Sequence, residues 1–206
     1  MLTPHAYLTL TSFGGILFVL PFILAIAFSL AMATPPRTAL VWLGATGCAL
    51  GTILILKLVF IPCGTFIGNL GIHSPSGHMA GAVTAYGGLA VVIHRLARHG
   101  WLRWGVFFIA ALFCAGIGYS RIVLGAHVPN EVYLGALAGL VSPLILLFAL
   151  PGAIPVLPKP LVLLAPALTI VILLLIVGEA GVTPEGYISN LSREIAAYFH
   201  VCGFNG

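Results

Sequence analysis

Six apolar segments, each about 20 residues long, leave this chain few folds other than a membrane helix bundle. They cover approximately residues 13–33, 39–61, 78–95, 102–120, 130–150 and 160–178. A helix needs roughly 20 apolar residues to cross the hydrocarbon core of a bilayer. Only 6% of the 206 residues are charged, whereas soluble domains carry about 25%. We therefore expect one all-α domain over residues 1–206, a polytopic membrane bundle of about six transmembrane helices.

The positive charges of the loops predict how these helices are oriented. Lys and Arg concentrate on the cytoplasmic side of membrane proteins. One predicted side of the bundle carries Arg37, Arg95, Arg98, Arg103 and Lys159. We expect this side to face the cytoplasm and the helix ends near Lys57, His78, Arg121 and His127 to face outward. Six crossings would place both termini outside as well, unless an interfacial turn in residues 1–12 changes the count.

The stretch "HSPSGHMAG", residues 73–81, is unusually polar for its position before the third apolar segment. Pro75 and Ser76 precede the helical run, and Gly77 has no side chain to block the approach of a ligand. The first amides of a helix point outward and bind anions. This pattern predicts a phosphate cradle. The alternative is that Ser74 or Ser76 only caps the helix, which would occupy the same amides.

A second polar motif, "SRIVLGAHVPNEV", covers residues 120–132. His127 and Glu131 are one helical turn apart, so the carboxylate can reach an imidazole nitrogen and fix its tautomer. Alternatively, Pro129 begins a helix and Glu131 only complements its cap and dipole. That alternative leaves Arg121 unexplained, because an arginine at this depth needs an anion or water.

Lys57 interrupts the second apolar segment, within "ILILKLVFIPCG". A lysine near a helix end can simply extend its ammonium group to the membrane interface. Its predicted position on the same membrane face as the two polar motifs favours a role in an anion site.

Together these residues resemble the phosphatidic acid phosphatase type 2 (PAP2) superfamily, the membrane relatives of the vanadium haloperoxidases. The family pattern is a lysine followed after six residues by Arg-Pro, then PSGH, then Ser-Arg, five residues, His, three residues and Asp. This chain has PSGH at residues 75–78 and "SRIVLGAH" at residues 120–127. The resemblance covers about residues 57–131 and implies the six-helix core of the family.

The chain departs from the family pattern at two positions. Glu131 stands where the family has aspartate, which keeps the carboxylate on a stem that is one methylene longer. Gly64 and Thr65 stand where the first motif has arginine and proline, so one cation of the phosphate site is absent.

The resemblance implies a role for each motif residue. His127 would be the nucleophile, Glu131 would orient it, and His78 would be the general acid. The phosphate oxygens would be bound by Lys57, Ser76, Gly77 and Arg121. The family chemistry needs no metal or other cofactor. His5, His94, His99 and His200 lack the spacing of metal ligands.

The function implied is hydrolysis of a lipid phosphate or lipid diphosphate through a phosphohistidine, at the periplasmic face of a bacterial inner membrane. Undecaprenyl diphosphate, phosphatidylglycerophosphate, phosphatidic acid and the phosphates of lipid A are all possible substrates. Two alternatives remain open: a lipid phosphotransferase that uses the same intermediate, and a catalytically weak lipid-binding protein of the same fold. We expect membrane lipids as surroundings and no nucleic-acid partner.

Two further features lie outside the motifs. Residues 184–200 place Ile188, Leu191, Ile195 and Phe199 at helical spacing, which predicts an amphipathic helix on the outer membrane surface. This helix either borders the site or is a simple interfacial anchor. Cys63 and Cys202 are both predicted outside, where an oxidising compartment permits a disulfide.

Overall fold

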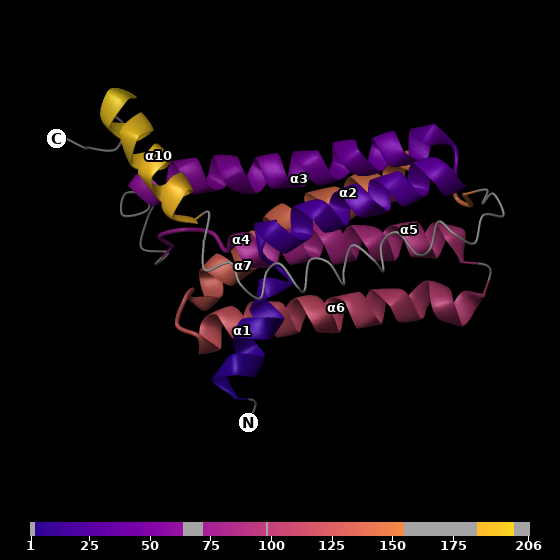
Figure 1. Cartoon of the computed structure of the whole chain (residues 1–206), viewed down its shortest axis with the longest axis horizontal. Helices are drawn as coiled ribbons and strands as arrows, with labels where there is room; N and C mark the ends of the chain where they lie inside the picture. Colours follow the sequence, from indigo (N-terminus) through magenta and orange to yellow (C-terminus); the bar gives the residue numbers. More distant parts are fainter. Residues whose placement is uncertain (1–2, 64–71, 98, 155–184, 200–206) are drawn as a thin grey trace.

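The computed structural model describes residues 3–63, 72–97, 99–154 and 185–199. Within these ranges the regular structure is entirely helical, as predicted, and Figure 1 shows the helices as one elongated bundle. The elements are α1 (Pro4–Ser12), α2 (Ile16–Ala33), α3 (Pro36–Cys63), α4 (Gly77–Ala82), the π-helical turn η1 (Val83–Gly87), α5 (Gly88–Leu96), α6 (Gly100–Val123), α7 (Pro129–Gly139), α8 (Val141–Ala149) and α10 (Glu185–Phe199).

Five described helices are long and apolar enough to cross a membrane, and the chain is an integral membrane protein. They are Ile16–Ala33, Pro36–Cys63, Gly77–Leu96, Gly100–Val123 and Pro129–Ala149. The third consists of α4, η1 and α5, and the fifth consists of α7 and α8. These five spans confirm the first five predicted segments. The sixth predicted segment, residues 160–178, lies outside the described residues.

Prolines and capping groups explain where the long helices begin and end. Thr34 ends α2 with extended backbone, and its hydroxyl donates to the carbonyl of Leu30 at 2.6 Å. Pro36 then begins α3, a position at which its missing N–H costs nothing. Pro129 begins α7 in the same way. Short connections of this kind make consecutive spans antiparallel, so alternate helix ends meet at the same end of the bundle.

Side-chain burial separates a packed interior from a lipid-facing surface. Phe18, Phe22 and Trp42 belong to the main buried cluster, and Trp42 Nε1 donates to the carbonyl of Ile23 at 2.9 Å. Large apolar side chains remain exposed along the bundle, among them Leu24, Phe28, Leu40, Ile55, Phe108, Ile109 and Leu112. In a membrane protein such a surface is solvated by lipid tails.

Exposed aromatic residues lie toward the two ends of α6. Trp101 and Trp104 are exposed in its first turn or two, and Tyr119 is exposed toward its last turn. Trp101 and Tyr119 are about 27 Å apart along an α-helix, close to the thickness of the hydrocarbon core. Trp and Tyr concentrate at the two membrane interfaces. The last turn of α6 therefore lies close to one interface.

Residues Glu185–Phe199 form the helix α10, within the segment 184–200 for which an amphipathic surface helix is predicted. It packs obliquely on the final part of α3 (Figure 1), where the buried Ser192 donates its hydroxyl to the carbonyl of Leu58 at 3.2 Å. Leu191 and Ile195 remain exposed. Thus α10 lies at the end of α3 that follows Lys57. Cys63, at the end of α3, is disulfide-bonded, and Cys202 lies outside the described residues.

Candidate active site

The motif residues gather at one end of the bundle from four chain segments. Lys57 lies near the C-terminal end of α3, and Ser76 caps α4 immediately before Gly77 and His78. Arg121 is in the last turn of α6, and His127 lies just before α7. The alternation of helix direction brings these segments together. Gly64 and Thr65 lie outside the described residues.

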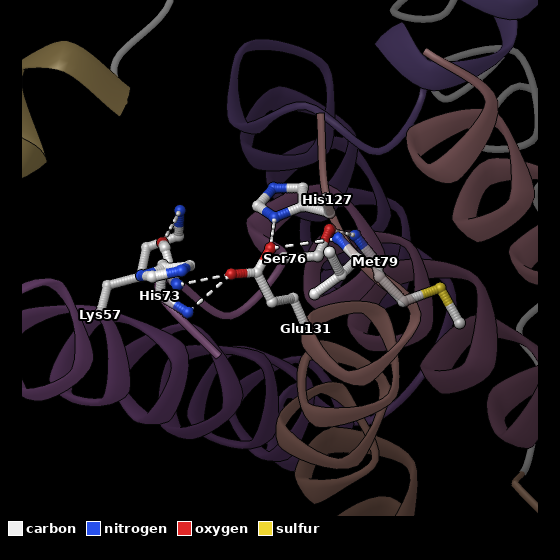
Figure 2. A network of polar contacts seen from close by, with 8 residues as sticks. Lys57, His73, Ser76, Met79, His127 and Glu131 are labelled. Atoms are coloured by element: carbon white, nitrogen blue, oxygen red, sulfur yellow. Dashed lines mark hydrogen bonds and ion pairs between the residues drawn. The ribbon is translucent and has the colours of Figure 1, made fainter. Parts of the chain in front are cut away.

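His127 and Glu131 form a buried pair at the start of α7 (Figure 2). Their Nδ1 and Oε2 atoms are 2.7 Å apart, and each side chain is 7% exposed. His127 Nε2 is also buried, and it has no hydrogen-bond partner among the described residues. A carboxylate at Nδ1 favours the tautomer in which Nδ1 carries the proton. The lone pair of a neutral His127 is then on Nε2.

Glu131 also holds the loop that carries the PSGH motif. Its Oε1 accepts hydrogen bonds from the backbone amides of His73 and Ser74, both at 2.8 Å (Figure 2). Its own carbonyl accepts a bond from the amide of Ser76 at 3.0 Å. Oε2 additionally accepts a 3.4 Å bond from the amide of Val128. Glu131 therefore caps α7, as the alternative reading proposed, but it also joins His127 to the polar loop.

Ser76 has the capping geometry that the sequence allows. Its hydroxyl accepts a 3.4 Å bond from the amide of Met79, and the residue is fully buried. Because α4 continues into η1 and α5, Gly77 and His78 open a helix of 20 residues. The amides at this end point away from the helix body, which suits an anion.

Glycines allow the two motif helices to approach each other closely. A Cβ atom on Gly135 of α7 would lie 2.4 Å from the carbonyl oxygen of Ser76, and one on Gly139 would lie 2.6 Å from that of Ala80. Both distances are too short for any side chain. Small residues at helix contacts of membrane proteins permit backbone packing of this kind. They set the PSGH loop against the start of α7.

Two cationic side chains reach this end of the bundle. Lys57 is only 5% exposed, and its Nζ lies 3.5 Å from the hydroxyl of Ser74. This burial does not fit the alternative in which Lys57 extends to the membrane interface. Arg121 is half-buried, and its Nη1 donates to the hydroxyl of Thr11 at 3.5 Å. Among the residues described here, two cations and a single carboxylate, that of Glu131, make this a site suited to anions.

Some contacts of the site are not apparent from the sequence. The motifs contain no signal that Glu131 bonds amides 57 and 58 residues earlier, or that Thr11 reaches Arg121. The pair Gly14–Gly15 indicates a turn but not where it packs. Within the described ranges, no three His, Cys, Asp or Glu side chains are grouped closely enough to hold a metal ion.

Comparison with known proteins agrees with the motifs and the fold. Residues 58–153 match the family model described as the PAP2 superfamily. No curated protein and no solved structure matched the chain. The matched range begins one residue after Lys57 and includes the PSGH motif, Arg121, His127 and Glu131. The resemblance to the PAP2 superfamily inferred from the motifs is therefore confirmed by the family model over residues 58–153.

Proposed function

We propose that this protein hydrolyses a lipid phosphate or lipid diphosphate through a phosphohistidine on His127. The buried pair of His127 and Glu131 carries the proposal, because it leaves Nε2 of the imidazole as the one ring nitrogen that can attack. Membership in the PAP2 superfamily indicates phosphatase or phosphotransferase activity on a phosphate-containing substrate. The five apolar spans favour a substrate that resides in the membrane.

In the first step, His127 Nε2 attacks phosphorus in line with the lipid-linked oxygen. The N–P bond forms as the P–O bond to the lipid breaks, and His78 donates its proton to the departing oxygen. The lipid leaves as an alcohol, or as a monophosphate if the substrate is a diphosphate. Glu131 stabilises the positive charge that develops on the imidazole of His127.

In the second step, water attacks the phosphohistidine. His78 accepts a proton from this water, the N–P bond breaks, and inorganic phosphate leaves with the lone pair of Nε2 restored. Lys57, Arg121, Ser76 and the amide of Gly77 bind the non-bridging oxygens in both steps. In phosphoryl transfer, positioning and charge stabilisation of this kind provide most of the catalysis. The mechanism as written uses no metal or cofactor.

Release of inorganic phosphate by the purified protein tests this function directly. A panel of undecaprenyl diphosphate, phosphatidylglycerophosphate, phosphatidic acid and lipid A would also identify the preferred substrate. We expect release from at least one of them. Retained lipid binding without release from any would refute the hydrolase and favour the catalytically weak lipid-binding protein.

The phosphotransferase alternative differs only in the acceptor of the phosphoryl group. The phosphohistidine would pass its phosphate to a lipid hydroxyl instead of water. A phosphate-labelled donor lipid supplied with an acceptor lipid separates the two reactions. We expect the label in inorganic phosphate, whereas label in the acceptor would identify a phosphotransferase.

Replacing Glu131 by Gln should reduce activity on the order of 10²- to 10⁴-fold with a small effect on stability. The Gln oxygen can still accept from the amides of His73 and Ser74. Its NH₂ group would then face His127 Nδ1 and favour the tautomer that protonates Nε2, which removes the nucleophile. Phosphate release and thermal unfolding in detergent measure the two effects.

Two variants complete this test. Glu131→Asp restores the family residue and should retain much of the activity, and Glu194→Gln alters an exposed glutamate of α10 and should behave as wild type. Equal activity of Glu131→Gln and wild type would leave Glu131 with a capping role alone.

We also propose that the site faces the periplasm of a bacterial inner membrane. The basic residues Arg37, Arg95 and Arg103 support this orientation, because they lie near the start of α3, the end of α5 and the start of α6, whereas the motif residues lie at the other ends of these spans.

Cysteine labelling checks the orientation. After Cys48 and Cys114, the described free cysteines, are replaced by alanine, a cysteine at the exposed position of His73 should react with an impermeant maleimide from outside intact cells. A cysteine at the exposed position of His99 should react only after permeabilisation. The reverse pattern would contradict both the orientation and a periplasmic substrate.

A further inference from the structure

The N-terminal turn, defined here as Thr11–Gly15, lies against the candidate active site. It consists of the last two residues of α1 and the three residues that lead to α2, and it precedes the residues that match the PAP2 superfamily. Its members nevertheless contact the PSGH helix, the arginine of α6 and the π-helical turn. These contacts indicate that the N-terminal turn has a role at the candidate active site in addition to linking two helices.

The backbone of Gly14 packs directly on the start of the PSGH helix. A Cβ atom on Gly14 would lie 2.5 Å from the carbonyl oxygen of His78, and one on Gly81 would lie 2.7 Å from the carbonyl oxygen of Gly14. Neither position has room for a side chain. The turn and the helix therefore approach as closely as two backbones can, and any displacement of one is transmitted to the other.

Gly15 leaves space for the imidazole of His78. A Cβ atom at this position would lie 3.2 Å from the carbonyl oxygen of Ser12, 3.3 Å from His78 Nε2 and 3.7 Å from His78 Cδ2. The backbone of Gly15 has φ −69° and ψ 147°, which any residue adopts. The conformation of the turn thus does not require glycine here. A methyl group here would be crowded by the carbonyl of Ser12 and by the imidazole of His78, the side chain that the mechanism assigns to proton transfer.

Thr11 contacts the arginine of the site from the other end of the turn. The residue is 6% exposed, and its hydroxyl accepts the 3.5 Å hydrogen bond from Arg121 Nη1. The contact belongs to a longer packing between α1 and α6 that includes the edge-to-face ring pair of Tyr7 and Tyr119. The hydroxyl restricts the orientation of a side chain that carries one of the phosphate-binding charges.

The turn is anchored by the π-helical segment of the PSGH helix. Tyr86 lies in η1 and donates its hydroxyl to the carbonyl of Phe13 at 2.8 Å. The ring of Phe13 packs edge-to-face on Phe18 and Phe113, with ring centroids 4.9 and 5.8 Å apart. Single π-helical turns often occur at functional sites. Here the wider turn carries the tyrosine that holds the N-terminal turn in place.

We propose that the N-terminal turn is a positioning element of the active site. In it, Gly15 leaves the space that the imidazole of His78 occupies, and Thr11 orients Arg121. The proposal rests on the proposed function, because it assigns His78 to proton transfer and Arg121 to phosphate binding. Neither Gly15 nor Thr11 touches the reacting atoms. Each acts through the motif residue that it contacts, so each substitution has a distinct kinetic signature.

The Gly15→Ala variant tests whether Gly15 determines the position of the His78 imidazole. Displacing a general acid by a fraction of an ångström should reduce phosphate release from an alkyl phosphate lipid about tenfold or more. The first-turnover burst of phenol from an activated aryl phosphate, whose leaving group needs no proton, should change less than about threefold. In a His78→Ala background the same substitution should cause no further loss, because its effect is transmitted through that ring.

Gly116→Ala is the matched control for this variant. Gly116 lies in α6 beside α1, and a Cβ atom there would meet only Leu10 at an ordinary 3.4 Å. Both substrates should be hydrolysed at the wild-type rate. Equal losses on the two substrates with Gly15→Ala, or no loss on either, would overturn the assignment of Gly15.

The Thr11→Val variant tests the contact with Arg121. Valine keeps the shape of threonine without the hydroxyl, so inhibition by inorganic phosphate should weaken about threefold to tenfold. The ratio of alkyl to aryl phosphate hydrolysis should stay the same. Thr11→Ser should restore inhibition, whereas an unchanged inhibition constant with Thr11→Val would overturn the assignment of Thr11.

Thermal unfolding in detergent identifies variants that fail for structural reasons. If Gly15→Ala does not fold, the test rests on the two Thr11 variants. The proposal then stands only if Thr11→Val weakens inhibition by inorganic phosphate and Thr11→Ser restores it. Different results would refute the proposed function itself. Wild-type protein would then release no phosphate from either substrate, or His127→Ala would leave release unchanged.

Discussion

Replacing His127 by Ala is expected to abolish phosphate release from every substrate, whatever its leaving group. The imidazole supplies the covalent bond to phosphorus: its Nδ1 contacts Glu131, and its Nε2 has no hydrogen-bond partner among the described residues. Loss of a covalent nucleophile reduces turnover on the order of 10⁴-fold or more. Phosphate release from an alkyl phosphate lipid and from an aryl phosphate measures the effect.

A second measurement shows whether the intermediate itself is lost. Wild-type protein quenched during turnover of labelled substrate should carry an acid-labile label, as a phosphohistidine does, and His127→Ala should carry none. His99→Ala is the matched control, because His99 is an exposed histidine at the opposite end of the bundle. Turnover that survives in His127→Ala would exclude the assigned nucleophile.

Replacing His78 by Ala should give a loss that depends on the leaving group. A general acid contributes about 10²- to 10⁴-fold when the departing oxygen is a strongly basic alkoxide. An aryl phosphate loses a phenolate that needs no proton, so its first step should be almost unaffected. Comparing the two substrates by first-turnover release of the alcohol or phenol gives the expected difference.

The second chemical step predicts another measurable effect of His78→Ala. If His78 also activates water, the His78→Ala variant should accumulate labelled phosphohistidine with the aryl phosphate, because the intermediate forms but is slow to hydrolyse. A loss that is equally large for both substrates, without a trapped intermediate, would contradict the assigned role. Thermal unfolding of the variant separates this result from a general loss of structure.

The local chemistry of the site follows from spacing along the chain. His127 and Glu131 are four residues apart at a helix start, and the 2.7 Å contact between them is the one that this spacing predicts. Ser76 lies before an apolar run and caps it. The first five apolar segments were predicted in the same way, because a membrane span depends on composition over a single window. The roles assigned to the site residues remain predictions.

The contacts between segments depend on tertiary packing. Glu131 bonds amides more than 50 residues away, and Thr11 meets Arg121 across 110 residues. The periodicity of the sequence does not predict such pairs, because they depend on how closely separate helices approach each other. That approach is set by glycines such as Gly14, Gly81 and Gly135, whose packing partners are far away in the sequence.

The sequence by itself determined the membrane-spanning architecture and the residue types of a phosphate site, because hydrophobic length and helical spacing are properties of short stretches. Only the tertiary structure decided that Lys57 is buried beside the polar loop, that Glu131 joins this loop to His127, and that an N-terminal turn contacts His78 and Arg121. These features arise where backbones from separate helices pack within van der Waals contact, and that geometry depends on the whole bundle.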